Sequence, residues 1–518
     1  MTDFAPSIGG RPLRLLFAGL MVGLLVSELE QTVFATALPT IVGDLDGAGH
    51  MLWVTTSYVL AATIVMPVYG KLGDLAGRKP LFIMALALFV AGSLIGGLSQ
   101  QMSVLIVGRA VQGLGGGGLL VLTQAIVADI VPARRRAPYM SVIGAVFAVS
   151  AAAGPLLGGW FADGIGWRWV FWINIPLGGV AIALAIGFLH LPASARGVVR
   201  IDVRGLAAMT IAVTALVLVA AWGGTEYAWI SPVVVGLGLV AVVSGVLFVA
   251  AERTAAEPLI PPAMFGQRNF TVATVGAAVM AVAMFGVITY LPTYLQMVSG
   301  LGATASGLMM LTLVAGLGIS TVVSAQIVSR TGCYSRLPVI GSAVVTVALL
   351  MFSALPEGTD LRLVGGVLFL FGVGIGCGLE VLVVTAQNAV HPSQQGTATA
   401  THAFFREVGV SLGAAVIGSV FTSRLTALLT QRSPVGLRPS GGDRGSLTPE
   451  LVRRLAPALR GPVISAYHDA LTTAFRHAVP LLVLSAIALA FLRPVPLATR
   501  LTEPAEDIRA AVGDRIDV

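Results

Sequence analysis

Residues 70–79 read Gly70-Lys71-Leu72-Gly73-Asp74-Leu75-Ala76-Gly77-Arg78-Lys79. This charged segment separates two apolar runs, 51–69 and 80–99, each long enough to cross the ~30 Å of hydrocarbon in a bilayer as a helix. Because charged side chains are costly in lipid, the segment must lie at a face of the membrane. Its glycines leave room for a tight turn between closely packed helices.

The composition places the whole chain in the membrane. Apolar residues make up 56%, charged residues only 11%, and the mean hydropathy is +0.91. A soluble domain carries roughly 25% charged residues, so this chain could not cover a soluble surface. We therefore expect an all-α polytopic membrane protein.

The basic charge and the cysteines point to no other class. The net charge is +7, but the basic residues are scattered over short loops without a basic helix, which argues against nucleic-acid binding. The two cysteines, Cys333 and Cys377, indicate neither a disulfide framework nor a metal cluster.

Hydropathy windows of about 19 residues predict fourteen spans. They are 13–36, 51–69, 80–99, 102–127, 138–160, 170–191, 206–224, 231–250, 270–295, 304–328, 337–355, 362–386, 400–423 and 470–492. An even number of spans puts both termini on one side, and the excess of Arg and Lys in the loops on that side predicts that it is the cytoplasm.

The spans group as six, two and six. We expect a cytoplasmic N-terminus at 1–12, a six-helix bundle at 13–191, an inserted helix pair at 206–250, a second bundle at 270–492 and a cytoplasmic tail at 493–518. The second bundle includes an extracytoplasmic loop, 424–469, whose first part is expected to be disordered and which has a short helix starting near Thr448. Segment 325–332 repeats the spacing of 70–77 weakly, with Gly332 matching Gly77 and Ser329 in place of the Asp.

Two carboxylates lie inside the first predicted span. Glu28 and Glu30 are two residues apart, about 200° around a helix, so they cannot point equally into one cavity. In the fourth span, Arg109 lies about as far below the outer end as Glu30 does, roughly 10 Å at 1.5 Å per residue. The matched depth predicts an ion pair between Glu30 and Arg109, which is either a proton-coupled switch or a static buried pair.

Two further features concern helix packing. Segment 113–118, Gly113-Leu-Gly-Gly-Gly-Gly118, satisfies G-x-G-x-x-G, but it lies inside a membrane helix and is expected to serve close packing rather than dinucleotide binding. Segment 154–160, Gly154-Pro-Leu-Leu-Gly-Gly-Trp160, predicts a kinked and tightly packed fifth span.

Other polar or aromatic positions are open to two interpretations. Trp53 and Tyr58 are expected at the membrane interface, with contact to the substrate as the alternative. Glu380 in the twelfth span is either a structural acid or a second acid for a cationic substrate or a proton. Arg406-Glu407, near the start of the thirteenth span, is expected to pair internally or with lipid headgroups. Asp129 and Arg134–Arg136 either hold Asp74 and Arg78 or are solvated charges.

Several of these segments resemble the major facilitator superfamily. Segment 70–79 resembles its loop between helices 2 and 3, although Leu75 stands where the family usually has a basic residue. Leu29-Glu30-Gln31-Thr32 followed by Ala37-Leu38-Pro39 resembles the L-D-x-T…A-L-P signature of its fourteen-span drug:proton antiporters (EmrB/QacA-like), with Glu30 where Asp is common. Segment 105–113 resembles the superfamily motif in which a buried Arg assists proton transfer. Segment 154–160 resembles the motif that marks the antiporters of the superfamily. Segments 167–178, 257–261 and 290–296 also resemble this branch, and their expected roles are interfacial anchoring and helix breaking.

The resemblance implies roles for particular residues. Glu30 and Arg109 would couple transport to protons. The conformational switch would include Gly70, Asp74, Gly77, Arg78, Gly154, Pro155, Gly158 and Gly159. The substrate cavity would draw on Gln31, Thr32, Gln112, Tyr290, Tyr294, Gln296, Glu380 and Gln387.

The implied function is secondary active efflux. An amphipathic, in some cases cationic, substrate would leave across the bacterial cytoplasmic membrane in exchange for protons, with no cofactor, metal, nucleotide or nucleic acid. One alternative is a dedicated exporter of a single metabolite, siderophore or antibiotic. Another is a lipid-handling scaffold without proton coupling. An enzyme is not expected, because no metal-ligand cluster, nucleophile–base pair or phosphate loop is present in the sequence.

Overall fold

The computed structural model describes residues 11–47, 50–189, 202–224, 226–432 and 457–497, together with Leu191 and Val452. Within these residues the chain is helical, and fourteen helices are long and apolar enough to cross a membrane. The predicted count is therefore confirmed for the described part of the chain. The predicted helix near Thr448, most of the predicted N-terminal segment 1–12 and most of the tail 493–518 lie outside the described residues.

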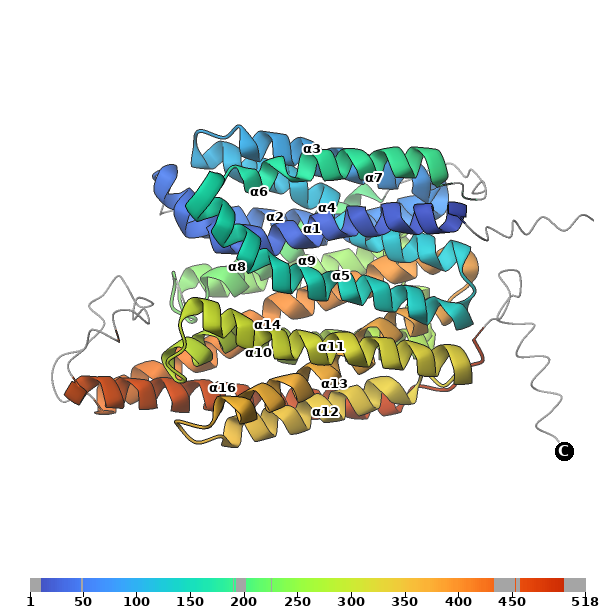
Figure 1. The fold of residues 1–518 in the computed structure, drawn as a ribbon. Coiled ribbons are helices and arrows are strands. Elements are labelled where there is room, and N and C mark those ends of the chain that lie inside the picture. The colour runs from blue at the N-terminus through green and yellow to red at the C-terminus, as the bar shows by residue number, and fades with distance from the viewer. Residues whose placement is uncertain are drawn as a thin grey trace, which may run out of the picture. The chain divides into compact units, whose positions relative to one another are not determined.

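The chain divides into two compact units, each with roughly parallel long helices (Figure 1). The first unit comprises Met1–Ile201, His391–Thr401 and Ala498–Val518, and the second comprises Asp202–Val390 and His402–Leu497. The first unit contains α1 (Arg11–Asp44), α2 (Met51–Ala76), α3 (Arg78–Gly97), α4 (Met102–Ile130), α5 (Ala133–Trp160), the π-helical turn η2 (Phe161–Ile165), α6 (Trp169–Trp172), α7 (Asn174–Phe188) and the 3-10 turn η4 (Pro392–Gln394).

The second unit holds the remaining helices. They are α8 (Val203–Trp222), α9 (Pro232–Thr254), the 3-10 turn η3 (Pro262–Gly266), α10 (Arg268–Met297), α11 (Ala303–Thr331), α12 (Arg336–Ala354), α13 (Leu361–Asn388), most of α14 (Gln395–Arg432) and α16 (Pro457–Ala490). The start of α14, up to Thr401, belongs to the first unit. The division groups α8 and α9 with the second unit, so their status as a separate insertion stays a prediction.

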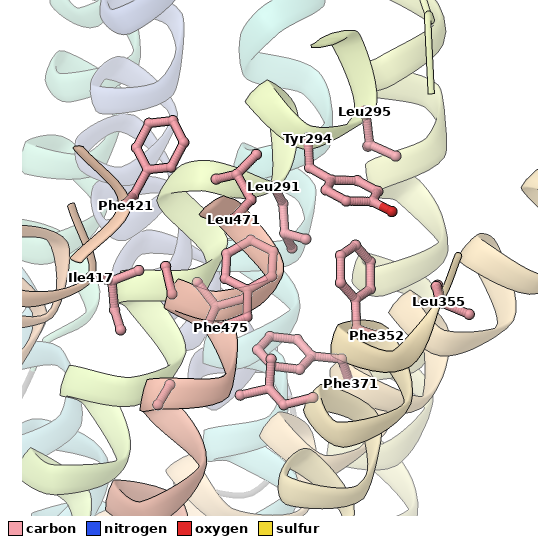
Figure 2. Close-up of a cluster of buried hydrophobic side chains, with 14 of the residues drawn as sticks. Leu291, Tyr294, Leu295, Phe352, Leu355, Phe371, Ile417, Phe421, Leu471 and Phe475 are labelled. Carbon is pink, nitrogen blue, oxygen red and sulfur yellow. The ribbon is translucent and has the colours of Figure 1, made fainter. Parts of the chain in front are cut away.

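Each unit has an apolar core and close helix contacts at glycine. In the second unit, a large apolar cluster draws aromatic and aliphatic side chains from α10, α12, α13, α14 and α16 (Figure 2). Phe352 lies at its centre, with ring centroids 4.8 Å from Tyr294 and 5.5 Å from Phe475. In the first unit, close helix contacts are made at glycines of α4. A Cβ at Gly113, Gly115 or Gly117 of α4 would overlap backbone carbonyls of α2 or α3. The predicted packing role of segment 113–118 is confirmed.

The turn near residue 77 differs from the prediction. Helix α2 continues through the charged segment to Ala76 and α3 begins at Arg78, so Gly77 alone lies outside a helix. Its φ of 93° suits glycine, because a Cβ is strained there. Gly332, the matching position in the weak repeat, also ends its helix with a positive φ, of 74°. The tight turn is therefore a single residue, and the charges on either side of it belong to helix ends.

Other boundaries also lie beyond the apolar runs. α5 begins at Ala133 rather than 138, and it runs through Pro155 to Trp160 before the π-helical turn. α14 begins at Gln395 and continues to Arg432, and α16 begins at Pro457, so the predicted loop 424–469 is shorter at both ends. Hydropathy marks only the part of a helix that needs an apolar environment, so polar helix ends escape it.

Candidate functional site

A buried ion pair lies inside the first unit. Arg109 of α4 contacts Glu30 of α1 through its Nη1 atom, and the two residues are 2% and 1% exposed. The same Nη1 atom donates a hydrogen bond to Gln112 Oε1 at 3.0 Å. The predicted pairing is therefore present, whereas Glu28, two residues earlier, is half-buried and not part of it.

Two aromatic rings complete the surroundings of Arg109. The guanidinium carbon lies 4.3 Å from the ring centroid of Phe34 and 4.3 Å from that of Tyr58, both close enough for cation–π attraction. The Tyr58 hydroxyl shares a hydrogen bond of 3.3 Å with Ser27. The expectation that Tyr58 lies at the membrane interface is wrong, because its side chain is 3% exposed and covers Arg109.

A chain of hydrogen bonds leads from this pair to α7. Gln112 Nε2 donates to Ser93 Oγ of α3 at 2.8 Å, and Asn174 Nδ2 of α7 donates to the same oxygen at 3.2 Å. Ser93 in turn donates to the carbonyl of Phe89. All of these side chains are buried, so the network fixes the amide of Gln112 and with it the partner of Arg109.

Sequence reasoning missed Ser93 and the role of Asn174. Segment 167–178 was expected to anchor the chain at the interface and to break helices. Instead Asn174 is buried, and Trp167 is 4% exposed and donates its Nε1–H to Asp44 at 2.9 Å. Arg168 also donates to Asp44, at 3.2 Å. The signal that would have found Asn174 is an amide placed within a strongly apolar run.

The predicted switch residues of α5 pack directly against α1. A Cβ at Gly154 would overlap Thr32, and a Cβ at Gly158 would overlap the carbonyl of Val33. Thr32 Oγ1 also donates to the carbonyl of Ser150 at 2.8 Å, which ties α1 to α5, and its predicted place in the substrate cavity stays a prediction. Gly159 differs from its neighbours, since a Cβ there would meet no atom within 4 Å, and Pro155 is exposed.

A second group of charged residues lies where α2 and α4 end and α3 begins. Arg78 forms ion pairs with Asp74 at 2.8 Å and with Asp129 at 2.6 Å. Arg136 donates to the carbonyls of Ala128 and Val131 at 2.7 and 2.8 Å. Asp129 and Arg136 are therefore partners in a local network rather than solvated charges.

Asp74 also binds the start of α14 within the first unit. Its carboxylate accepts hydrogen bonds from the backbone N–H of Gly396 at 3.0 Å, and from the backbone N–H and hydroxyl of Thr397 at 2.7 and 2.8 Å. A negative charge there also complements the positive end of the helix dipole. Gly70 does not form a turn: it is helical, and a Cβ there would overlap Ala400 and Gly396 of α14.

The remaining cavity candidates lie in several environments. Gln31, Gln296 and Glu380 are half-buried, and Gln112 and Gln387 are buried. Tyr290 donates to the carbonyl of Ala414 at 3.5 Å, and Tyr294 lies within the apolar core of the second unit with its hydroxyl 3.4 Å from His468 Nδ1. A substrate role for these residues stays a prediction.

The Glu30 carboxylate uses only one of its oxygens in the pair with Arg109. The Oε2 atom of Glu30 is buried and has no hydrogen-bond partner among the described residues, so it offers a free acceptor. A proton there would remove the charge that Arg109 faces, and an uncompensated buried charge is costly. No group of three or more metal-ligating side chains was found in the described part of the chain.

Known proteins with the same pattern are transporters. The family model described as Major Facilitator Superfamily matches residues 20–414. An uncharacterized MFS-type transporter of Mycobacterium tuberculosis is 40% identical over 96% of this chain and 72% of its own length. Multidrug resistance protein 3 of Bacillus subtilis is 31% identical over 92% of this chain and 94% of its own length. The crystal structure of the human organic anion transporter MFSD10 has a similar fold, with a TM-score of 0.63 at 16% identity over 93% of this chain and 100% of that one. The chain belongs to the major facilitator superfamily, whose members are transporters rather than enzymes.

Proposed function

We propose that this transporter exports amphipathic small molecules across a bacterial cytoplasmic membrane in exchange for protons, without a cofactor. The observation that carries the proposal is the ion pair of Glu30 and Arg109, buried inside a bundle of membrane-spanning helices. An ionisable group at such a position is costly and marks an ion or substrate pathway by default. The name of the Bacillus subtilis relative supports drugs as the substrate class.

The proposed cycle uses the charge of Glu30. When Glu30 takes up a proton on Oε2 from the outer side, Arg109 keeps its positive charge with only Gln112 and two aromatic faces as partners. Breaking a buried ion pair in this way costs about 3–5 kcal/mol. The protonated form of this conformation is therefore destabilised, and the protein is expected to change conformation. Loss of the proton to the cytoplasm restores the pair and favours binding of the next substrate molecule.

We propose that the charged group of Asp74, Arg78 and Asp129 controls this conformational change. Asp74 bonds to Gly396 and Thr397 at the start of α14, whose later residues belong to the second unit. We propose that a change at these hydrogen bonds is passed on along α14, which is one continuous helix. The contacts of Gly154 and Gly158 with α1 place the antiporter-like segment beside the helix that carries Glu30.

The decisive experiment measures proton movement in proteoliposomes with an imposed pH gradient when ethidium is added. The variants are Glu30→Gln and, as a matched control, Glu226→Gln, which makes the same chemical change at an exposed acid between α8 and α9. We expect the parent and Glu226→Gln to respond to ethidium and Glu30→Gln to fall to the level of empty liposomes.

Two results would overturn the proposal in different ways. An unchanged response in Glu30→Gln would place the coupling acid elsewhere. A parent protein that responds to none of a broad panel of dyes, but to a single metabolite, would make it a dedicated exporter instead.

A further inference from the structure

A serine of α3 connects two amide side chains beside the Glu30 site. Ser93 Oγ donates its hydrogen to the carbonyl of Phe89 at 2.9 Å. The same oxygen accepts from Gln112 Nε2 at 2.8 Å and from Asn174 Nδ2 at 3.2 Å. A hydroxyl has one hydrogen and two acceptor lone pairs, so the hydrogen-bonding capacity of Ser93 is fully used. Because the hydrogen of Ser93 is bound to Phe89, the group that Gln112 turns toward Ser93 has to be a donor.

Gln112 is therefore held in one orientation. Its amino group faces Ser93 and its Oε1 atom faces Arg109 Nη1, at 3.0 Å. Arg109 has donors only, so it requires the same orientation of the amide from the other side. The side chain of Gln112 also packs over Gly92 of α3, where a Cβ would overlap the backbone nitrogen and the Cγ atom of Gln112. The amide oxygen is thus a fixed second acceptor for Arg109, beside Glu30.

Asn174 is fixed by contacts of its own segment. Its Nδ2 atom also donates to the carbonyl of Val170 at 3.3 Å. The ring of Phe171 lies against α3, where a Cβ at Gly96 would overlap it. The centroid of that ring is 6.0 Å from the centroid of Phe34, which covers the guanidinium of the ion pair. The amide of Asn174 is therefore held in place to fill the second acceptor position of the serine.

We propose that Ser93 and Asn174 are positioning residues for the protonation of Glu30. They keep the amide oxygen of Gln112 on Arg109 after the carboxylate has lost its charge. Protonation forms one O–H bond on Glu30 with a proton taken from water, and no other covalent bond changes. The link to transport rests on the proposed antiport, whereas the protonation of Glu30 can be measured without a substrate.

The amide oxygen matters more in one protonation state than in the other. When Glu30 is ionised, Arg109 has both a carboxylate oxygen and the amide oxygen of Gln112 as acceptors. When Glu30 is protonated, Arg109 depends on the amide oxygen, because a buried charge without a hydrogen-bond acceptor is costly. A loosely held Gln112 therefore destabilises the protonated state more than the ionised state, and protonation of Glu30 then needs a lower pH.

Few other charges act on Glu30. The charged or titratable side chains around it are Arg109 of α4 and Tyr58 of α2, with Glu28 on the same helix. Two further helices pack against α1. Of these, α7 has no charged residue, and the charged residues of α5, Arg134–Arg136, lie in its first turn. A change in the protonation of Glu30 when Ser93 is altered is therefore expected to act through Arg109.

The test is infrared spectroscopy of the full-length protein in proteoliposomes as the pH is varied. The absorption of the protonated Glu30 carboxyl group is the band that is absent in Glu30→Gln. We expect the pH of half-protonation to be about one unit lower in Ser93→Ala than in the parent, and to shift less, in the same direction, in Asn174→Leu. The matched control is Ser353→Ala, because Ser353 is buried and donates to the carbonyl of Leu350 in its own helix. It should leave the pH of half-protonation unchanged.

Gln112→Leu distinguishes positioning from a general structural role. In this background Ser93→Ala and Asn174→Leu should cause no further shift, because both act through Gln112. Further shifts of the same size would indicate that the substitutions loosen the contact of α3 with α4, and would refute positioning. So would a pH of half-protonation that neither substitution moves in the parent. If Ser93→Ala does not fold, Asn174→Leu alone carries the same comparison.

Ethidium-driven proton flux in the same proteoliposomes separates this proposal from antiport. If the parent shows no flux with any of a broad panel of substrates, antiport is refuted while the infrared titrations still decide the positioning. If flux is present but the titrations of the variants match that of the parent, antiport stands and the positioning is wrong. If the parent has no Glu30 band at any pH, Glu30 does not take up a proton and both proposals fail.

Discussion

Arg109 keeps its charge in a site that offers one carboxylate, one amide oxygen and two aromatic faces. Only the carboxylate carries a full opposite charge, so the site is neutral when Glu30 is ionised and positive when it is protonated. The ring quadrupoles attract the guanidinium whether or not Glu30 is charged, so they stabilise Arg109 in both protonation states. The rings therefore hold Arg109 in the site when Glu30 no longer pairs with it.

Tyr58 allows the ring and the hydroxyl to be tested separately. Tyr58→Phe keeps the ring over Arg109 and removes the bond to Ser27, so transport should stay within about threefold of the parent, the effect of one weak hydrogen bond. Tyr58→Leu removes the ring as well. A desolvated cation–π contact is worth about 2 kcal/mol, so ethidium-driven proton flux should fall by about thirtyfold.

The measurement is the initial flux in proteoliposomes at equal protein content, and Tyr227, an exposed tyrosine, offers the control Tyr227→Leu. Equal losses in Tyr58→Phe and Tyr58→Leu would assign the effect to the hydroxyl and would contradict the role given to the ring.

Depth in the membrane is the part of this site that could be predicted from the sequence. Counting residues along the apolar runs placed Glu30 and Arg109 at one level, and the structure confirms their contact, although α1 continues to Asp44, beyond the predicted end of its span at residue 36. Tyr58 lies seven residues after Met51, at a similar level, and the same argument applied to α2 would have placed it correctly. Ser93 and Asn174 could not be found in this way, because depth does not tell which helices are neighbours or how each is rotated.

Helix packing in the first unit depends on the absence of side chains along one helix. Gly117 of α4 lies so close to α2 that a Cβ would overlap the carbonyl of Ala62. Gly238 of α9 is also helical, but a Cβ there would meet no atom within 4 Å. The sequence predicted close packing at segment 113–118, but only the structure tells which glycines need to stay glycine.

This contrast predicts opposite effects of the same substitution. Gly117→Ala should lower the melting temperature of the purified protein, since overpacking costs about 1–3 kcal/mol. Gly238→Ala should leave it unchanged or raise it, because alanine favours a helix over glycine by about 0.5–1 kcal/mol. Thermal unfolding in detergent followed by circular dichroism measures both. A melting temperature that rises in Gly117→Ala would show that the two helices separate easily and would contradict the close packing.

The described part of the chain has an even number of spans, and α9 is the least buried of them. The helices α8 and α9 pack on each other, and the most apolar window of α9 is only 11% buried. Glu252 of α9 accepts a hydrogen bond from the backbone N–H of Ile260 at 2.9 Å, which ties the pair to the segment before α10. The fourteen spans could be predicted from hydropathy alone, whereas their grouping as six, two and six stays a prediction. Which helices the pair contacts could not be predicted, since an apolar surface has no directional preference.

Deletion of residues 202–254 should therefore preserve the fold and the sidedness of everything that follows. Removing two spans leaves α10 crossing in its original direction, whereas removing α9 alone, Pro232–Thr254, would force every later helix to cross in reverse. A reporter enzyme fused to the C-terminus measures this: we expect cytoplasmic activity for the parent and the pair deletion, together with retained ethidium-driven proton flux. The single-helix deletion is the matched control and should lose both. If the pair deletion keeps a cytoplasmic C-terminus but loses flux, α8 and α9 take part in transport. If the C-terminus of the parent lies outside the cytoplasm, the predicted cytoplasmic termini are refuted.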